Sequence, residues 1–495
     1  MQEQLPALLI IIPLMAAPLC VIVRHALVCW WIALVASASS LFCAFRLLGV
    51  VSADGPLHYA LGGWAAPTGI EYYVDSLNAV VLLLVTGIAL VALLYARESI
   101  AGSIQEGRRY LFYTVWLLCM TGLAGMLVTG DAFNVFVFLE ISSLATYTLI
   151  SFGEDRRALT ASFRYLVLGS VGASFILIGI GFLYAATGTL NMQDLAARIP
   201  ESESQRAILV AFCFLTIGVM IKSAIFPLHA WQPNAYHFGP VSSTAFIAGT
   251  ASKVSLYVLL RFFFGIFGEE FAMREHFLTA ALLPAAVAGF IIMSLVAIYQ
   301  NDLRRMLAFS SVAQIGYIVA GISLATEAGL TAGIAHMINH GMIKAALFLA
   351  VGCILFRVGH CHTPSLDELF RRMPLTCTAF TIAGLALIGV PLTAGFVSKA
   401  ALIGAAIEHG WWLIAVLILV SSLLSIIYVG RVIEIMIFRR SRSLAPSAAG
   451  YDEAPLAMLI PLYVLVALIV LLGIRGDLVL DLANAGAIDL LGGFR

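Results

Sequence analysis

The sequence predicts an all-α, polytopic integral membrane protein with about 14 transmembrane helices. Of its 495 residues, 62% are hydrophobic and only 11% are charged, and the mean hydropathy is +1.02. A soluble domain usually has about 25% charged and about 45–50% apolar residues. The apolar residues form continuous runs near the length of about 20 residues that crosses a bilayer. They do not alternate with polar residues, as they would in a transmembrane β-barrel.

Fourteen apolar segments predict the spans, and the whole chain, 1–495, forms a single membrane domain. The segments are 5–23, 27–49, 77–96, 110–129, 132–152, 161–187, 207–226, 241–265, 278–299, 306–324, 329–356, 376–407, 411–437 and 454–474. The polar and aromatic stretch 51–75 is predicted to be a loop. Residues 191–206 are predicted to form a short amphipathic helix at the membrane surface.

The composition also excludes several classes of protein: a soluble enzyme, a disordered protein and a nucleic-acid-binding protein. The 27 basic residues are balanced by 27 acidic ones, so no surplus of positive charge is available to bind an anionic polymer. The sequence has no glycine-rich phosphate loop, nucleophile elbow or cysteine cluster. We therefore predict no catalytic residue, cofactor or metal site in this chain.

The distribution of arginines between the loops predicts the orientation of the chain in the membrane. With the N-terminus outside, the inner loops carry about twice as many arginines as the outer ones, as expected for cytoplasmic loops. The N-terminal stretch lacks the basic region of a signal peptide, so the run 5–23 is expected to remain as a span. We expect an N-terminus outside and a location in a bacterial plasma membrane.

The four lysines of the chain all lie within predicted spans, whereas every basic residue in a loop or tail is an arginine. They are Lys222, Lys253, Lys344 and Lys399. A charged side chain at the centre of a span costs about 2.5–3.5 kcal/mol, so these groups must be paired, hydrated or neutral. Lysine loses its proton when buried, whereas arginine keeps it. The pattern favours groups that titrate inside the membrane over purely structural bridges.

Further titratable groups lie in the predicted spans. Glu140 is the acid that lies clearly deep in the first twelve spans, and Lys222 is its natural partner. His336, His340 and Lys344 are spaced four residues apart, which places them on one face of a helix. Such a stripe is typical of a proton wire. A histidine pair at this spacing also occurs in metal sites, but no acidic ligand adjoins it here.

Two proline-interrupted spans carry similar short sequences, PLHA at Pro227 and PLTA at Pro391. Five spans separate them, and an odd number implies an inverted repeat with its transport site near the membrane midplane. Lys399 follows the second interruption. His229 and His237 follow the first, where they serve either as groups for proton uptake or as ordinary interfacial histidines.

Several long motifs resemble the antiporter-like membrane subunits of respiratory NADH–quinone oxidoreductase (complex I) and the large subunits of Mrp-type multisubunit Na⁺/H⁺ antiporters. The resemblance covers about residues 70–437, and the stretch before the third span is most similar to the D-type Mrp subunit. The motifs are GDAFNVFVFLEISSLATYTLI, IKSAIFPLHAWQPNAYHFGPVSS, GTASKVSLYVLLR, NDLRRMLAFSSVAQIGY, HMINHGMIKAALFLAVG and GVPLTAGFVSKAALI.

The resemblance implies two inverted five-helix repeats, 110–265 and 278–437, with broken helices seven and twelve. It implies that Glu140 and Lys222 form the family's Glu–Lys pair and that Lys253 is the connecting lysine. His336, His340 and Lys344 then take the central positions, and Lys399 is the terminal lysine. The implied partners are other hydrophobic subunits of the same complex, the lipid bilayer, protons and Na⁺.

We predict a proton-translocating, antiporter-like subunit of a multisubunit membrane complex, with Na⁺/H⁺ antiport of the Mrp type. The main alternative is a proton-pumping membrane subunit of a respiratory NADH–quinone oxidoreductase or a related redox-driven complex. In that case the chain belongs to a translocase enzyme without carrying its redox site. A stand-alone transporter of an organic solute and a structural scaffold are further alternatives.

Overall fold

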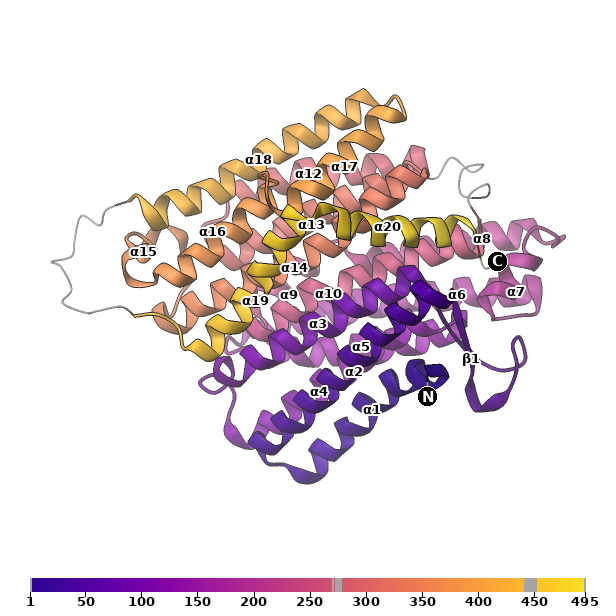
Figure 1. Cartoon of the computed structure of the whole chain (residues 1–495), viewed down its shortest axis with the longest axis horizontal. Helices are drawn as coiled ribbons and strands as arrows, with labels where there is room; N and C mark the ends of the chain where they lie inside the picture. Colours follow the sequence, from indigo (N-terminus) through magenta and orange to yellow (C-terminus); the bar gives the residue numbers. More distant parts are fainter. Residues whose placement is uncertain (1, 269–270, 272–277, 440–451, 494–495) are drawn as a thin grey trace.

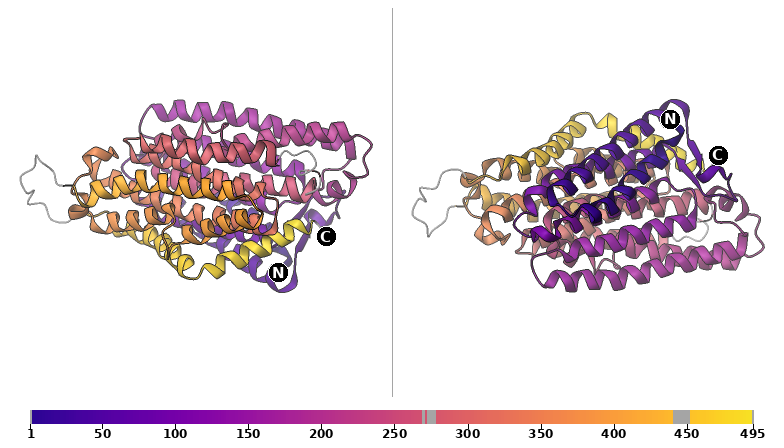
Figure 2. Two further views of the ribbon diagram at one scale, coloured as in Figure 1. Left: turned by 90° about the horizontal axis from the view of Figure 1, so that it is seen from above. Right: turned by 90° about the horizontal axis from the view of Figure 1, so that it is seen from below.

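A computed structural model describes residues 2–268, 271, 278–439 and 452–493. Long helices running roughly parallel to one another dominate it (Figure 1, Figure 2). Among the described residues, 13 helices are long and apolar enough to cross a membrane. The remaining predicted span, 376–407, is split into two shorter helices. The predicted all-α membrane fold is therefore confirmed.

The first half of the chain forms helices α1 to α10. They are α1 (Leu5–Val23), α2 (Ala26–Asp54), α3 (Ser76–Ser99), α4 (Arg109–Val128), α5 (Ala132–Ser151), α6 (Arg157–Thr187), α7 (Met192–Arg198), α8 (Gln205–Ser223), α9 (Gln232–Phe238) and α10 (Val241–Leu260), which a π-helical turn, Arg261–Ile266, extends. Aspartates begin two of them: the carboxylates of Asp75 and Asp131 accept the backbone N–H of Asn78 and Asn134, as N-cap residues do.

The second half continues the bundle. Its helices are α12 (Leu283–Ile298), preceded by the π-helical turn Leu278–Leu282, α13 (Leu303–Ser323), α14 (Glu327–Val358), α15 (Leu369–Arg372), α16 (Pro374–Ile388), α17 (Ala394–Glu408), α18 (Trp412–Ile437), α19 (Leu456–Ile474) and α20 (Gly476–Leu491). Helix α14 lies at the centre, and nearly all of its residues from Gly329 to Ile354 are buried. It packs against α3, α10, α13, α16, α17, α19 and α20.

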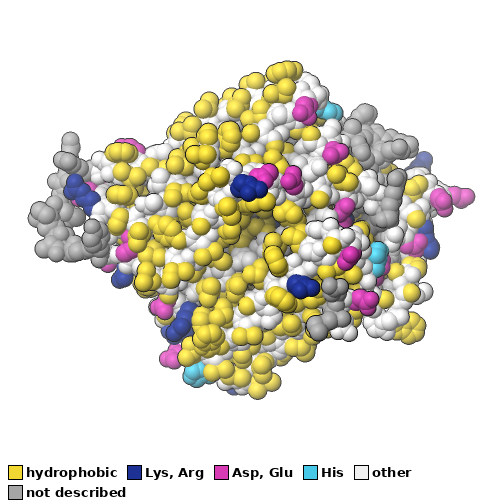
Figure 3. All heavy atoms as spheres, viewed as in Figure 1, with side chains coloured by type: hydrophobic (Ala, Val, Ile, Leu, Met, Phe, Trp, Pro, Cys, Tyr) yellow, Lys and Arg dark blue, Asp and Glu magenta, His cyan; other side chains and the backbone are white. Residues whose placement is uncertain are grey.

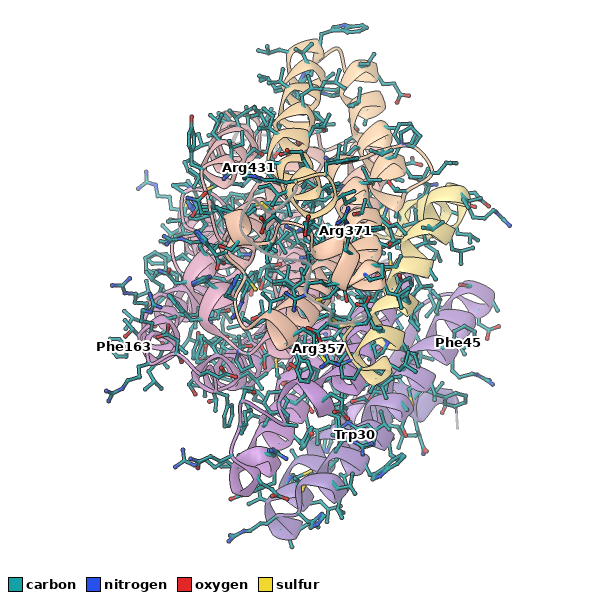
Figure 4. The ribbon with its side chains drawn as sticks, turned by 90° about the vertical axis from the view of Figure 1, so that its left-hand side faces the viewer. Trp30, Phe45, Phe163, Arg357, Arg371 and Arg431 are labelled. Carbon is teal, nitrogen blue, oxygen red and sulfur yellow. The ribbon has the colours of Figure 1, made fainter. Side chains whose placement is uncertain are left out.

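The two ends of the bundle differ in chemistry. We call the end that carries Arg97, Arg157, Arg305, Arg357 and Arg371 the arginine-rich end, and Figure 4 views the molecule from this side. The opposite hairpin end carries the two β-strands found among the described residues. Four of the arginines that were counted to predict the orientation lie outside the described residues: Arg274, Arg440, Arg442 and Arg495. The orientation across the membrane remains a prediction.

Two predicted connections differ from the structure. The stretch 51–75, expected to be a loop, contains an antiparallel hairpin of β1 (Leu57–Ala60) and β2 (Glu71–Val74), in which Leu57 pairs with Val74. The buried carboxylate of Glu71 accepts the Nδ2–H of Asn191 at 2.7 Å, so the hairpin is tied to the segment that follows α6. In the stretch 191–206, only Met192–Arg198 forms the helix α7.

Both predicted helix interruptions are present. Helix α8 ends at Ser223, the following residue Ala224 has a φ of 57°, and α9 begins at Gln232. Helix α16 ends at Ile388 and α17 begins at Ala394. Between these two helices Gly389 has a φ of 95°, a conformation that glycine adopts without steric cost.

The boundaries 110–265 and 278–437 of the inverted repeats remain a proposal, which two isolated β-bridges support. Asp131 before α5 pairs with Asn191 after α6, and Asp302 before α13 pairs with His362 after α14. The first bridge lies at the hairpin end and the second at the arginine-rich end. Equivalent contacts at opposite ends are what an inverted repeat requires.

The sequence did not predict the last helix, α20. It follows α19 after a change of direction at Arg475, whose φ is −106° and ψ 61°, and it runs along the bundle to the hairpin end (Figure 1). At that end the carboxylate of Asp489 accepts the backbone N–H of Ser76 at 2.9 Å. Three aspartates interrupt its apolar residues, so it lacks the continuous hydrophobic run by which a span is predicted.

Candidate functional site

All four lysines are buried in the bundle, with exposed fractions of 4% or less. They lie on four different helices, α8, α10, α14 and α17. Three of these helices, α10, α14 and α17, are neighbours in the bundle. Packing of α14 against both α10 and α17 brings them together.

The predicted pair of Glu140 and Lys222 is present. The Lys222 Nζ lies 3.6 Å from the Glu140 carboxylate, 2.8 Å from the Ser143 hydroxyl and 3.3 Å from the Tyr147 hydroxyl. Glu140, Ser143 and Tyr147 follow one face of α5 at helical spacing. The lysine side chain is 3% exposed and that of Glu140 is 30% exposed. The ammonium is thus held by one charged and two neutral oxygens.

Lys253 and Lys344 share a simpler environment. Each donates to one backbone carbonyl and one serine hydroxyl: Lys253 to Ala248 at 2.5 Å and Ser252 at 3.3 Å. The partners of Lys344 are the Leu307 carbonyl at 3.0 Å and the Ser310 hydroxyl at 2.5 Å. Neither has a carboxylate partner among the described residues. Neutral oxygens alone stabilise a buried charge incompletely, so both amines are suited to gaining and losing a proton.

The histidines of α14 connect this set to α17. His336 contacts the Ser398 hydroxyl through Nδ1 at 2.9 Å and the Gln314 side-chain oxygen through Nε2 at 3.0 Å. The rings of His336 and His340 stack, with centroids 6.1 Å apart. Both ring nitrogens of His340 are buried without a protein hydrogen-bond partner. Ser398 directly precedes Lys399 on α17.

Lys399 binds the broken end of α16. Its Nζ donates to the carbonyls of Leu387 and Ile388 at 3.0 and 2.9 Å and contacts the Ser422 hydroxyl at 3.3 Å. The last carbonyls of a helix have no intrahelical partner, and that end carries a partial negative charge. The interruption after Ile388 therefore creates the site that holds this ammonium. The aromatic ring of Tyr317 lies 4.9 Å from the same nitrogen.

His229 and His237, which the sequence offers either for proton uptake or as interfacial histidines, lie between α8 and α10. His229 is partly buried and its Nδ1 has no protein partner, while His237 Nδ1 lies 3.1 Å from the Asp302 carboxylate. His237 and Asp302 line a cavity of about 350 Å³ together with Glu154, Arg304 and other residues. Burial alone would raise the pKa of Asp302, but contacts with His237 and the backbone N–H of Arg305 lower it overall.

The lowered pKa of Asp302 gives a pH-dependent prediction. The contribution of this carboxylate is fully present above the unfolded-state pKa, near 4, and is lost as the pH falls through the lower folded-state value. Asp302→Asn keeps an N-cap side chain on α13 but removes the charge. We expect a lower melting temperature than that of the parent protein at pH 7, and a difference that shrinks below about pH 4.

Thermal unfolding of the detergent-purified protein across this pH range provides the measurement. Asp155→Asn serves as the control, because Asp155 pairs with Arg157 at an exposed site where an ion pair contributes little. An equal destabilisation by Asp302→Asn at every pH would contradict the assignment of the effect to the charge.

The sequence missed several side chains that complete the site. The neutral partners of the charged groups are Ser143, Tyr147, Ser252, Ser310, Gln314, Tyr317, Ser398 and Ser422. Their signal is weak, because serine is common where transmembrane helices pack closely. Arg431 on α18, which is labelled in Figure 4, donates to the carbonyl of Ile298 and the side chain of Asn301.

The bundle and its buried groups define a polytopic membrane protein that holds a set of titratable side chains inside the bilayer. The described residues contain no group of three potential metal ligands. What the arrangement offers chemically is proton binding at amines and imidazoles, separated by hydroxyls, amides and backbone carbonyls.

Comparison with known proteins identifies the family. The profile of the NADH:quinone oxidoreductase/Mrp antiporter transmembrane family matches residues 129–425. NADH-quinone oxidoreductase subunit N of Desulforudis audaxviator is 38% identical over 97% of this chain and 98% of its own length. The D-type subunit of the Na⁺/H⁺ antiporter from Alkalihalophilus pseudofirmus is 31% identical over 84% and 83%, respectively.

A solved structure agrees with these relatives. A chain of the Mrp complex from Dietzia sp. superposes with a TM-score of 0.90 and 26% identity, covering 99% of this chain and 97% of the other. The present chain belongs to the NADH:quinone oxidoreductase/Mrp antiporter family and is an antiporter-like membrane subunit. The predicted family is confirmed.

Proposed function

We propose that this chain is a proton-translocating subunit of a multisubunit membrane complex that exchanges Na⁺ for H⁺ in the manner of Mrp antiporters. The observation that carries the proposal is the series of titratable groups within the bundle, from the partly exposed Glu140 and the buried Lys222 to Lys399. A structural scaffold gains nothing from four buried lysines, each of which costs free energy to insert.

In the proposed route, protons enter at the arginine-rich end near His229 and His237 and reach Lys222. They pass by way of Lys253 to Lys344, His340 and His336, and leave from Lys399. The contact of His336 with Ser398 supports the last transfer. Buried polar atoms without a protein partner, including both ring nitrogens of His340, favour water as the connecting group, since buried polar groups are normally hydrogen-bonded.

We further propose that the arginine-rich end faces the cytoplasm and that the N-terminus lies outside a bacterial plasma membrane. The gathering of arginines at one end of the bundle supports this orientation (Figure 4), because cytoplasmic loops are enriched in basic residues.

The pair on α5 and α8 provides the direct test. Glu140→Gln keeps the size of the side chain but removes its charge, leaving Lys222 with only the two hydroxyl partners. We expect at least a tenfold lower rate of Na⁺-dependent proton movement, because the ammonium at this position loses its only carboxylate partner among the described residues. The measurement is the fluorescence of a pH-sensitive dye in inverted vesicles that carry the assembled complex.

Glu434→Gln is the matched control, because Glu434 lies exposed on α18 and forms no ion pair among the described residues. Unchanged transport by Glu140→Gln would make the Glu140–Lys222 pair purely structural. Equal losses in both variants would point to defective assembly.

A redox-driven complex is the second candidate, favoured by 38% identity to a subunit of NADH-quinone oxidoreductase over nearly the whole chain. Mild detergent purification of the native complex separates the two. Partners that contain flavin or iron–sulfur centres would establish a redox-driven pump, and proton movement would then follow electron transfer. A set of hydrophobic subunits without such centres, together with Na⁺-dependent proton movement, would establish the antiporter.

A further inference from the structure

One face of the bundle combines exposed apolar and charged side chains. It is formed by α19, α20 and the segment between α16 and α17, and we call it the elbow face after the change of direction at Arg475. Leu392, Ile460 and Ile474 are 61–69% exposed on it. Figure 3 shows this face covered by hydrophobic side chains, with a small group of basic and acidic ones over the junction of α19 and α20, far from both ends of the bundle.

The depth of the elbow follows from two contacts of α20. The Asp489 carboxylate binds the first turn of α3 at Ser76, and Asn484 contacts Thr331 in the second turn of α14 at 3.0 Å. Both helices begin at the hairpin end. At 1.5 Å per residue, Asp477 lies about 18 Å from that end of α20. Helix α3, with 24 residues, is about 36 Å long, so the elbow lies about halfway through the bundle.

Charged side chains are exposed at this depth. Arg475 and Asp477 form an ion pair at 2.7 Å, with 58% and 50% of their side chains exposed. Asp481 is exposed one turn further along α20. Ionisable residues at the membrane centre almost always face protein or water and not lipid, because hydrocarbon solvates charge poorly. Together, the carboxylates of Asp477 and Asp481 and the guanidinium of Arg475 give the elbow one net negative charge.

An interrupted backbone lies beside these charges. Gly473 packs against the backbone of the interruption between α16 and α17, where an added Cβ would come 2.4 Å from the Leu392 carbonyl oxygen. Leu392, at the exposed side of that interruption, has a φ of 69°. Irregular backbone at membrane depth is tolerated where protein or a water-filled cavity surrounds it, not where lipid does. The two interruptions therefore mark a surface that protein or water, and not lipid, covers.

The surface next to the elbow is also hollowed. A groove of about 490 Å³ is lined by α2 residues between Phe45 and Asp54 and by Leu482 of α20, one residue after Asp481. The charges of Arg46 and Asp54 in this lining balance each other, so the excess negative charge of the elbow remains. The groove offers space for side chains of a further helix.

We propose that the elbow face binds a transmembrane helix of another subunit, and that this helix carries a basic side chain near mid-membrane opposite Asp477 and Asp481. The excess negative charge of the elbow determines the sign of the partner residue, and the groove receives neighbouring side chains of the same helix. The proposal concerns assembly and does not depend on which ions the complex moves.

Site-specific photo-crosslinking in the assembled complex tests the proposal. A photoreactive amino acid replaces Leu478, which is 40% exposed at the elbow, or Leu423, which is 61% exposed on α18. We expect Leu478 to yield a crosslink to a different subunit, within an apolar segment that contains lysine or arginine. Leu423 should not crosslink to that segment. A crosslink only to lipid, or to a second copy of this chain, would overturn the proposal.

Charge reversal at the elbow provides an independent measurement. Asp481→Lys places a positive charge opposite the proposed basic residue, so the amount of that subunit recovered with the chain should fall about tenfold or more. Glu408→Lys, at the exposed end of α17, is the control and should leave recovery unchanged. Size-exclusion chromatography of the tagged chain confirms that each variant is folded. Normal recovery with folded Asp481→Lys would contradict the proposed contact.

Discussion

Lys222→Arg is expected to reduce Na⁺-dependent proton movement at least a hundredfold while leaving the chain folded and inserted. Arginine keeps its proton at every physiological pH, whereas lysine releases it when its surroundings change. The Lys222 ammonium is buried and held by Glu140, Ser143 and Tyr147, so a guanidinium retains the positive charge and its carboxylate partner. What it loses is the ability to pass the proton on to the next group.

The experiment compares dye-monitored proton movement with the amount of assembled complex in the same vesicles. Arg371→Lys, the reverse exchange at an exposed site, is the control and should transport normally. Lys222→Gln removes both the positive charge and the proton that the lysine can release. Its comparison with Lys222→Arg therefore separates the role of the charge from the role of proton transfer. Full transport by Lys222→Arg would show that this lysine holds the structure together and does not titrate.

Gly395→Ala is expected to have the second largest effect, on both stability and transport. A Cβ at this position would lie 1.8 Å from the carbonyl oxygen of Ala386 on α16, far inside the closest contact of two atoms. Helix α17 must then move away from α16, and the Leu387 and Ile388 carbonyls separate from Lys399. Overpacking of this kind costs about 1–3 kcal/mol, and the displaced ammonium adds the cost of an unpaired charge.

Gly404→Ala on the same helix is a closely matched control, because a Cβ there meets no atom within 4 Å. Thermal unfolding in detergent should show a lower melting temperature for Gly395→Ala and no loss for Gly404→Ala, and transport should follow the same order. Equal melting temperatures for the two variants would mean that α16 and α17 do not rely on this close approach.

Much of the fold follows from features that act locally along the chain. Continuous apolar runs located the spans, since each has to satisfy its backbone hydrogen bonds within itself. Lys222 and Glu140 were recognised as partners because a charge in the membrane needs a counter-charge. Pro391 indicated the interruption that the structure places before α17.

Other features depend on contacts between distant segments. Strands β1 and β2 have four residues each, and the hairpin is fixed by Asn191, far away in the sequence. The hydroxyl of Ser310 binds Lys344, yet in the sequence it resembles any small residue at a helix contact. Helix α20 was not predicted, because its aspartates interrupt the apolar run by which a span is recognised. The hairpin contact and the Ser310 contact are not local signals, so no sequence window contains them.

In the proposed proton route, the interruption of α16 links the proton occupancy of Lys399 to the position of α17. The carbonyls of Leu387 and Ile388 form a negative helix end, and the Lys399 ammonium on α17 is their counter-charge. When that amine releases its proton, the attraction joining the two half-helices weakens. By thermodynamic reciprocity, whatever presses the half-helices together also holds the proton in place. A neighbouring subunit that displaces α17 can therefore change the proton occupancy of Lys399 without contacting this residue.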